Sequence, residues 1–516
     1  MDRTSAAPAV PAGLEPPIEA PARYARGAIP PALTPARPVA AAAQPGTPVA
    51  QPGPAAAQPG PAPTPDPQAR PSGPAAVTRN LLRHFQRIRQ HLSDPLFRNA
   101  YALMINTGTT GLLGLVYWLL AARHYTAADV GRASAAYAAM NLLAGITGLS
   151  LTGALARFMP QSGGTTRALI LRAYAVSAAA SLLITVPFLL TVGHWGSSYS
   201  ELAGVTAGFV FTAAVVVWSI FTLQDGALIG MRNSPWVAIE NGVFGVAKIF
   251  LLIGFAAVLP HLGIYISWLL PVVIAVPLVN MLIFRRLVPR HERLVGDRQP
   301  PTTRQVGRFV AGDFTGSLCL LATVNLVPIV VATLVGPGAN AYFYIAWTVG
   351  TTVDLLAINM AMSLTVESAF NRAKLAAHTR TAMRRTFLIL VPVAALTAAL
   401  APWALSLFGP GYAAHGAPIL QLLAVATLPK ALTELYFGAL RAQSRTSRIA
   451  VVQVVRAVLL LGLALVLTRL MGTVGAAVAV LASQLITMVL ILPGLRAVLA
   501  QDRPRAAVAV AEGELS

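Results

Sequence analysis

Apolar residues along this chain come in long runs separated by short polar segments, beginning at Arg98. Each run has about 20 residues, the length that a helix needs to cross the hydrocarbon core of a bilayer. The runs predict twelve spans, at 99–121, 133–156, 168–192, 203–224, 237–259, 263–284, 308–335, 341–366, 384–408, 416–440, 449–469 and 474–497. The fold class that this pattern predicts is an all-α polytopic integral membrane protein.

The composition agrees with this prediction. The chain has 516 residues, of which 56% are hydrophobic and 11% are charged, whereas soluble domains carry about 25% charged residues. The only cysteine, Cys319, falls inside a predicted span, so no intramolecular disulfide can form. The balance of residues requires lipid as the solvent.

The two ends of the chain differ from the spans. Residues 1–78 hold 20 of the 39 prolines, which predicts a disordered, Pro/Ala-rich tail. Residues 79–94 place apolar residues on one face of a helix and arginines on another, which is typical of a basic amphipathic helix on an anionic membrane surface. Residues 499–516 form a second, short tail.

Basic residues collect on one side of the predicted topology. That side receives arginines or lysines from the tail, from the linker 285–307 and from the connections after spans two, four, eight, ten and twelve. The other side holds only Arg123, Arg132 and Arg469. The positive-inside rule therefore predicts a multi-pass protein of the plasma (inner) membrane with both termini in the cytoplasm.

A weak internal repeat divides the spans into six and six. The segment 226–241 aligns with 438–453 at an offset of 212 residues, which matches Gly-Ala-Leu in both and sets Asn241 against Gln453. Because each repeat has an even number of spans, both halves have the same orientation. We expect two pseudo-symmetric six-helix lobes, at 98–284 and 308–498, with any pathway between them.

Catalytic and metal-binding motifs are absent. The sequence has no GxxxxGK[ST], HExxH, CxxC or plausible GxSxG, so we predict no enzyme activity, no catalytic residues and no metal site. The net charge of +20 comes mainly from arginine. Because no folded basic domain accompanies it, we expect no nucleic-acid partner.

Charged residues inside or at the edge of the spans are the candidates for function, because charge at membrane depth is costly. They are Asp225, Glu240, Lys248, Asp313, Asp354, Glu367, Lys430, Glu434 and Arg456. The simplest interpretation pairs Lys430 with Glu434, one turn apart on one helix face. Asp225, Glu240 and Glu367 suit capping or anchoring, and Lys248 and Arg456 suit snorkelling to the interface. Asp313 and Asp354 have no cation nearby in sequence, which favours a wet cavity.

The spans also carry a resemblance to a known family. Arg98-Asn99, Ala122-Arg123, "ADVG" at 128–131, "ARFMP" at 156–160, "GPGYAAHGAPILQLLA" at 409–424 and "GALRAQ" at 438–443 resemble the bacterial polysaccharide-biosynthesis flippases. These are the O-antigen and teichoic-acid exporters of the multidrug, oligosaccharidyl-lipid and polysaccharide exporter (MOP) superfamily. The resemblance covers about 98–500.

The resemblance implies alternating access through a cavity lined by spans one, two, seven and eight, and close helix packing by the small residues of span two. It implies a polyprenyl-phosphate-linked oligosaccharide as substrate, with anionic lipids and glycan-synthesis enzymes as partners. Arg157 would meet the phosphate or would only anchor the span. The candidate substrate-binding residues are Arg157, Asp313, Asn325, Asp354, Lys248 and Arg456. No cofactor is expected, and a coupling cation or proton is left open.

Three further functions stay as alternatives at this point. The first is an ion-coupled exporter of drugs or small molecules from the same superfamily. The second is a membrane glycosyltransferase or polymerase, which the short outer loops disfavour because they offer no acidic pair. A membrane scaffold that recruits partners through the tail is a third, weaker one.

Overall fold

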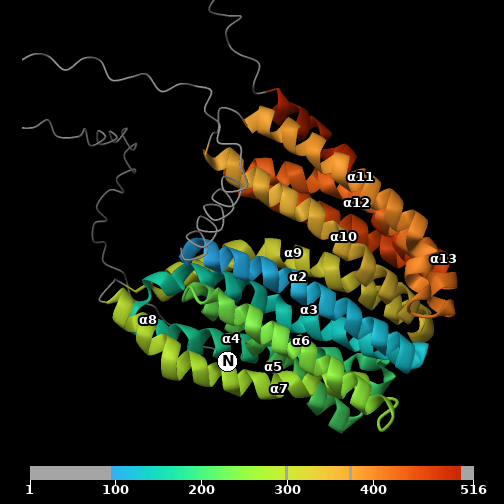
Figure 1. Cartoon of the computed structure of the whole chain (residues 1–516), viewed down its shortest axis with the longest axis horizontal. Coiled ribbons are helices and arrows are strands. Elements are labelled where there is room, and N and C mark those ends of the chain that lie inside the picture. Colours follow the sequence, from blue (N-terminus) through green and yellow to red (C-terminus); the bar gives the residue numbers. More distant parts are fainter. Residues whose placement is uncertain (1–94, 297–299, 371–374, 501–516) are drawn as a thin grey trace, which may run out of the picture. The chain divides into compact units, whose positions relative to one another are not determined.

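The computed structural model describes residues 95–296, 300–370 and 375–500. The tail 1–78, the surface helix 79–94 and most of the segment 499–516 therefore lie outside the described residues. Within the described ranges all regular structure is helical, as the apolar runs predict. Figure 1 shows the helices lying side by side along their lengths.

The first group of helices follows the first six predicted spans. Short 3-10 turns join several of them, and a π-helical turn at Ile283–Leu287 leads into a short amphipathic helix. The group comprises α2 (Pro95–His124), α3 (Ala127–Phe158), α4 (Thr166–Leu190), α5 (Val205–Gly230), α6 (Ser234–Ala256), α7 (Gly263–Leu282) and α8 (Val288–Val295). We call it the N-terminal helix group. Within it, α6 packs on α2 and α7, and α5 packs on α3 and α4.

The second group follows the remaining predicted spans. It comprises α9 (Thr303–Val335), α10 (Pro337–Phe370), α11 (Leu375–Ser406), α12 (Pro410–Ala442) and α13 (Thr446–Leu499). We call it the C-terminal helix group. Helix α12 is its centre, because it packs on α10, α11 and α13 and most of its residues are buried.

Helices α13 and α3 are not single straight spans. The 54 residues of α13 would extend about 80 Å as one helix, far more than the roughly 30 Å of a bilayer core. Gly472 has non-helical angles (φ 63°, ψ −143°), so α13 consists of two spans joined there. Helix α3 bends by 47° between Ile146 and Gly148 and crosses as one bent span. With the other nine long helices, the described part of the chain holds the twelve spans predicted.

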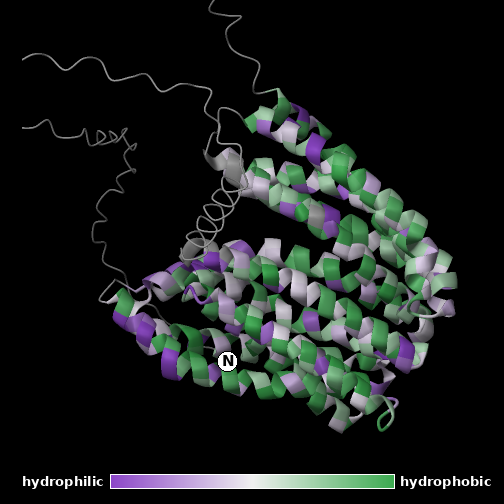
Figure 2. Cartoon of the chain, viewed as in Figure 1, coloured by the Kyte–Doolittle hydropathy of each residue, from purple (hydrophilic) through white to green (hydrophobic). Residues whose placement is uncertain are grey.

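The surface of the helices shows their environment. Large apolar side chains stand exposed on the outer faces, for example Leu183 (75%), Leu190 (81%) and Leu388 (73%). In Figure 2 hydrophobic residues follow the helices along their lengths, while hydrophilic residues gather at places such as α8. Because water would not tolerate so much exposed apolar surface, these faces contact lipid.

Small residues in α3 allow close packing, as the family resemblance implies. The alanines of α3 at 133, 135, 136, 138, 139 and 144 are all buried. A Cβ atom at Gly131 would overlap the carbonyl of Pro337 on α10, and one at Gly145 would lie 2.7 Å from a methyl of Leu321 on α9. Helix α3 therefore packs both inside its own group and against α9 and α10 of the other.

Hydrogen bonds join the two groups at one end of the bundle. The connections at 159–165, 231–233 and 443–445, which contain arginines or are flanked by them, lie at what we call the basic end. At the opposite end, Asn340 of α10 donates from Nδ2 to the Gly131 carbonyl at 2.8 Å and to Ser134 Oγ at 3.1 Å. Arg123 at the end of α2 donates from Nε to the Leu407 carbonyl at 2.5 Å.

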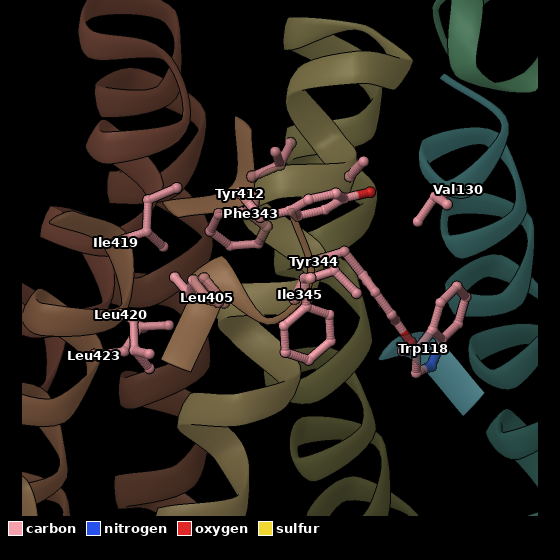
Figure 3. Close-up of a cluster of buried hydrophobic side chains, with 14 of the residues drawn as sticks. Trp118, Val130, Phe343, Tyr344, Ile345, Leu405, Tyr412, Ile419, Leu420 and Leu423 are labelled. Carbon is pink, nitrogen blue, oxygen red and sulfur yellow. The ribbon is translucent and has the colours of Figure 1, made fainter. Parts of the chain in front are cut away.

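A buried apolar cluster reinforces this junction. The rings of Trp118 on α2 and Tyr344 on α10 meet edge to face, with centroids 4.9 Å apart. Figure 3 shows Trp118 and Val130 on one side of Tyr344 and the leucines of α11 and α12 on the other. The opposite end therefore combines apolar packing with hydrogen bonds that join the two groups.

Candidate functional site

Two ion pairs cross between helices of the C-terminal group. Lys430 Nζ on α12 lies 2.6 Å from Asp354 Oδ2 on α10, and Arg456 Nη1 on α13 lies 3.1 Å from Glu434 Oε1 on α12. The prediction that Lys430 pairs with Glu434 on their own helix is therefore wrong. Each side chain reaches a neighbouring helix instead, where an opposite charge faces it. Asp354, which the sequence left without a cation, is neutralised by Lys430.

The two pairs differ in accessibility. The side chains of Arg456 and Glu434 are 4% and 11% exposed, whereas those of Lys430 and Asp354 are 24% and 13% exposed. Arg456 also lies over the Phe437 ring at 5.6 Å, so it does not snorkel to the interface. The Arg456–Glu434 pair is therefore the more enclosed of the two, and the Asp354–Lys430 pair is the more accessible.

Lys248 of α6 lies in a box of aromatic rings in the N-terminal group. Its Nζ is 3.9 Å from the ring centroid of Trp268, 4.8 Å from that of Tyr117 and 5.1 Å from that of Phe244. The residue is only 4% exposed, so the snorkelling interpretation is wrong here too. Cation–π attraction to three rings offsets part of the cost of burying the ammonium group.

No acid accompanies this lysine. Among the described residues Lys248 has neither an ion pair nor a hydrogen bond, in contrast to Arg456, its counterpart in the second half. Tyr117, whose hydroxyl donates to the Ile264 carbonyl at 3.0 Å, holds one wall of the box in place. Sequence reasoning missed these rings, although Tyr and Trp at midspan positions were a signal that could have found them.

A cavity of about 480 Å³ adjoins the aromatic box. Its walls come mainly from α3, α5 and α7, with Trp118 of α2, and they include aromatic side chains and a single charged one, Glu201 of the connection before α5. Trp268 belongs to both features: it lines the cavity and contacts Lys248. The other aromatic lining residues are Trp118, Tyr137, Phe211, Trp218 and Tyr265. Such a cavity suits an apolar or aromatic group.

Arg157 is exposed at the basic end of α3. Its guanidinium carbon lies 5.1 Å from the ring centroid of Phe309 on α9 and 5.8 Å from that of Phe158. The two rings meet edge to face at 5.6 Å. Arg157 therefore stands where the two helix groups meet, and no carboxylate within the described ranges pairs with it.

The remaining candidates make only local contacts. Asp313 on α9 is exposed and accepts a hydrogen bond from Ser317 Oγ at 2.8 Å. Asn325, further along α9, donates to the Leu321 carbonyl of its own helix at 3.1 Å. The side chain of Glu367 lies outside the described part of the chain. The candidates thus do not converge on one point, and the ion pairs that join them among the described residues are Asp354 with Lys430 and Arg456 with Glu434.

A polar network at the opposite end was not anticipated. Arg132 of α3 bridges Asp129, at 2.6 Å, and Glu201, at 2.7 Å, and His261 Nδ1 lies 3.1 Å from the same Asp129 carboxylate. Thr126 caps α3 by accepting from the Asp129 N–H. These residues tie the start of α3 to two connections of its own group and account for the presence of Arg132 away from the basic end.

Comparison with known proteins gives the fold. No protein-family model and no curated protein matches the chain. Among solved structures, an inward-facing multidrug resistance MATE family transporter of the MOP superfamily superposes with a TM-score of 0.62 at 15% identity, covering 78% of this chain and 99% of that one. The lipid II flippase MurJ in an inward closed conformation superposes with a TM-score of 0.61 at 12% identity, covering 77% and 89%.

A third similar structure is a MOP superfamily transporter from Pyrococcus furiosus, described by the reverse polarity of its binding pocket. It superposes with a TM-score of 0.51 at 15% identity over 80% of this chain and 98% of that one. At these identities the likeness extends to the fold, and it covers nearly the whole length of the three structures. The chain therefore has the fold of the MOP-superfamily transporters.

Proposed function

We propose that the protein is a flippase that moves a polyprenyl-phosphate-linked oligosaccharide across the plasma membrane for cell-envelope polysaccharide synthesis. The observation that carries the proposal is the position of Arg157. It is exposed at the basic end, it stacks on Phe309 of the other helix group, and no described carboxylate neutralises it. By the positive-inside rule that end faces the cytoplasm, where such a lipid is made available.

The chemistry of Arg157 suits a phosphate. A guanidinium group stacked on aromatic rings still presents its N–H donors at the edge, and these match phosphate oxygens in a bidentate geometry. Phe309 and Phe158 hold the group from the side without competing for those donors. A lysine at this position would offer one mobile point charge and no fork.

The distribution of paired and unpaired cations supports an anionic substrate. The two cations inside the C-terminal group have acidic partners, whereas Lys248 of the N-terminal group has only aromatic rings. An anion bound between the groups would therefore be attracted mainly to the N-terminal side. The adjoining aromatic cavity offers an apolar environment to the prenyl part of the same molecule.

Transport would follow from the unequal ends of the bundle. The hydrogen bonds of Asn340 and Arg123 join the groups at the opposite end, and the substrate would enter from the basic end. Alternating access would break these bonds and close the basic end of the bundle. Anionic lipids around the arginine-rich connections and glycan-synthesis enzymes beside them complete the proposed setting.

An exporter of small molecules is the second candidate function. It is favoured by the cavity, whose volume of about 480 Å³ falls in the range of sites for drug-sized ligands. Because Lys248 stands behind Trp268, such a ligand would be neutral or anionic and aromatic, not cationic. This function requires no phosphate group on the ligand and assigns no role to Arg157.

The decisive experiment is complementation of glycan export in a flippase-deficient strain, with protein levels measured for each variant. We expect Arg157→Ala to abolish export and Arg157→Lys to restore it poorly. Arg172→Ala is the matched control, because Arg172 is also an exposed arginine near the basic end and makes no hydrogen bond or ion pair with another described residue. Full export by Arg157→Ala would overturn the proposal, and drug efflux by the same cells would favour the exporter.

A further inference from the structure

A row of exposed arginines lies where α7 continues into α8. The chain stays helical from Gly263 to Val295, with the π-helical turn Ile283–Leu287 between the two helices. Hydrophilic residues gather on α8 (Figure 2), and they include Arg290 and Arg293. With Arg286 of the π-helical turn, these two follow one another at intervals of four and three residues, so all three share one face of the helix. We call Arg286, Arg290 and Arg293 the arginine stripe.

The opposite face of this helical corner is packed against the N-terminal helix group. Ile283, Leu287 and Val288 are buried there. His291 Nε2 lies 3.0 Å from the Met159 carbonyl, in the connection between α3 and α4. The backbone that carries the arginine stripe is therefore fixed by contacts in which the arginines take no part, and the three guanidinium groups point away from the bundle into the surroundings.

No acid within the described ranges pairs with the arginine stripe. The acid nearest to it in sequence is Glu292, whose Oε1 is turned towards α4 and accepts from the Arg167 N–H at 3.5 Å. Helix α4, which packs against α8, adds the exposed side chains of Arg167 and Arg172 and contains no acid. The guanidinium groups of the stripe are thus free to bind an anion from outside the chain.

The arginine stripe lies at the level of the lipid headgroups. Arg286 follows Gly263, the first residue of α7, by about 35 Å at 1.5 Å per residue, slightly more than the roughly 30 Å of a hydrocarbon core. Apolar side chains flank the stripe on the same continuous helix: Leu278 is 56% exposed, and Leu294, one turn beyond Arg290, is 75% exposed. A ligand that contacts both the arginines and these side chains combines an anionic group with an apolar chain.

We propose that the arginine stripe is a binding site for the headgroup of an anionic phospholipid in the adjoining leaflet. The guanidinium forks match the phosphate oxygens, and the fixed backbone holds them in one row. A zwitterionic headgroup fits less well, because its ammonium group is repelled by the same arginines. The site specifies the lipid partner of the proposed function, on which it rests for its setting. It is measured without export, so its failure leaves the role of Arg157 untouched.

The test is lipid-dependent stability of the purified full-length protein in detergent. Phosphatidylglycerol or, as the zwitterionic control, phosphatidylcholine is added to the micelles at equal mole fraction, and Tm is measured. We expect only phosphatidylglycerol to raise Tm, because a ligand that binds the folded state stabilises it. High salt should reduce the shift, since exposed charges are screened. Inorganic phosphate without lipid is the third arm, and an equal shift with it would show an anion site that needs no lipid and overturn the proposal.

Variants assign the effect to the arginine stripe. The triple variant Arg286→Gln/Arg290→Gln/Arg293→Gln should lose most of the phosphatidylglycerol shift. It should keep the wild-type Tm in phosphatidylcholine, because all three side chains are exposed and none forms an ion pair with a described acid. If the triple variant does not fold, Arg290→Gln, in the middle of the stripe, decides by a reduced shift.

A second triple variant controls for net charge. Arg384→Gln/Arg385→Gln/Arg448→Gln removes three exposed arginines from the C-terminal helix group and should keep the full shift. An equal loss in both triple variants would show a diffuse attraction to the charge of the whole protein and would overturn the site. A wild type whose Tm does not respond to phosphatidylglycerol would overturn it as well.

Discussion

Lys430 on α12 lies 2.6 Å from Asp354 on α10, although Glu434 is one turn away on the same helix as Lys430. Glu434 is itself taken by Arg456 of α13, so the four charges alternate across three helices. The arrangement is neutral overall, and it ties the centre of the C-terminal group together through its side chains. A change at one of these positions therefore affects its partner on another helix.

We expect Asp354→Asn to destabilise the protein by about 1–3 kcal/mol, because it leaves Lys430 partly buried without a counter-charge. The double variant Asp354→Asn/Lys430→Gln should recover much of this loss. Thermal unfolding of the four proteins of this double-mutant cycle measures the coupling. Strictly additive effects would show that the pair contributes nothing. Loss of export by Asp354→Asn alone must be compared with its stability before a transport role is assigned.

Removing the charge of Lys248 should not destabilise the protein, in contrast to Asp354→Asn. Lys248→Met removes a buried charge without an acidic partner and places a flexible thioether among three aromatic rings, so stability should stay the same or rise. Export should fall, since the cation is removed from the side where we place the anion. Arg456→Met is the comparison, because it leaves Glu434 uncompensated and should lower Tm. Equal losses of stability in Lys248→Met and Arg456→Met would contradict the distinction between an unpaired and a paired buried cation.

The packing of α3 against α10 gives a steric prediction. Gly131→Ala should disturb the opposite end, because the new methyl group would overlap the Pro337 carbonyl beside the Asn340 hydrogen bonds. We expect a lower Tm and increased labelling of a cysteine placed at Asn340. Gly108→Ala on α2 is the matched change, since no heavy atom lies within 4 Å of its new methyl group. Normal stability and labelling in Gly131→Ala would argue that the two groups separate there without cost.

The orientation can be tested by cysteine labelling from outside intact cells, in a Cys319→Ser background. Ser200→Cys, in the connection before α5, should react with a membrane-impermeant maleimide. Arg290→Cys, in α8 at the basic end, should react only after the membrane is opened. Both side chains are exposed, so accessibility within the protein does not limit the comparison. Labelling at position 290 in intact cells would reverse the proposed orientation and with it the entry side of the substrate.

The sequence alone determined the features that depend on the lipid surroundings of the chain. The spans are readable because every turn of a membrane helix must be apolar over a fixed length, and each predicted run corresponds to a helix of the structure. Close packing by the small residues of α3 was predictable for a related reason, since only small side chains let backbones approach. The turn at Gly472, between the last two predicted spans, also fell where the apolar runs separate.

Only the tertiary structure decided which charges meet. Sequence spacing suggested a pair between Lys430 and Glu434. Instead, Lys430 pairs with Asp354 of α10, and Glu434 pairs with Arg456 of α13. The same holds for Lys248, whose three aromatic neighbours come from α2, α6 and α7. It also holds for Glu240, whose carboxylate oxygens have no hydrogen-bond partner among the described residues. Long side chains at membrane depth are paired by whichever helix faces them, and the order of residues along one helix does not contain that information.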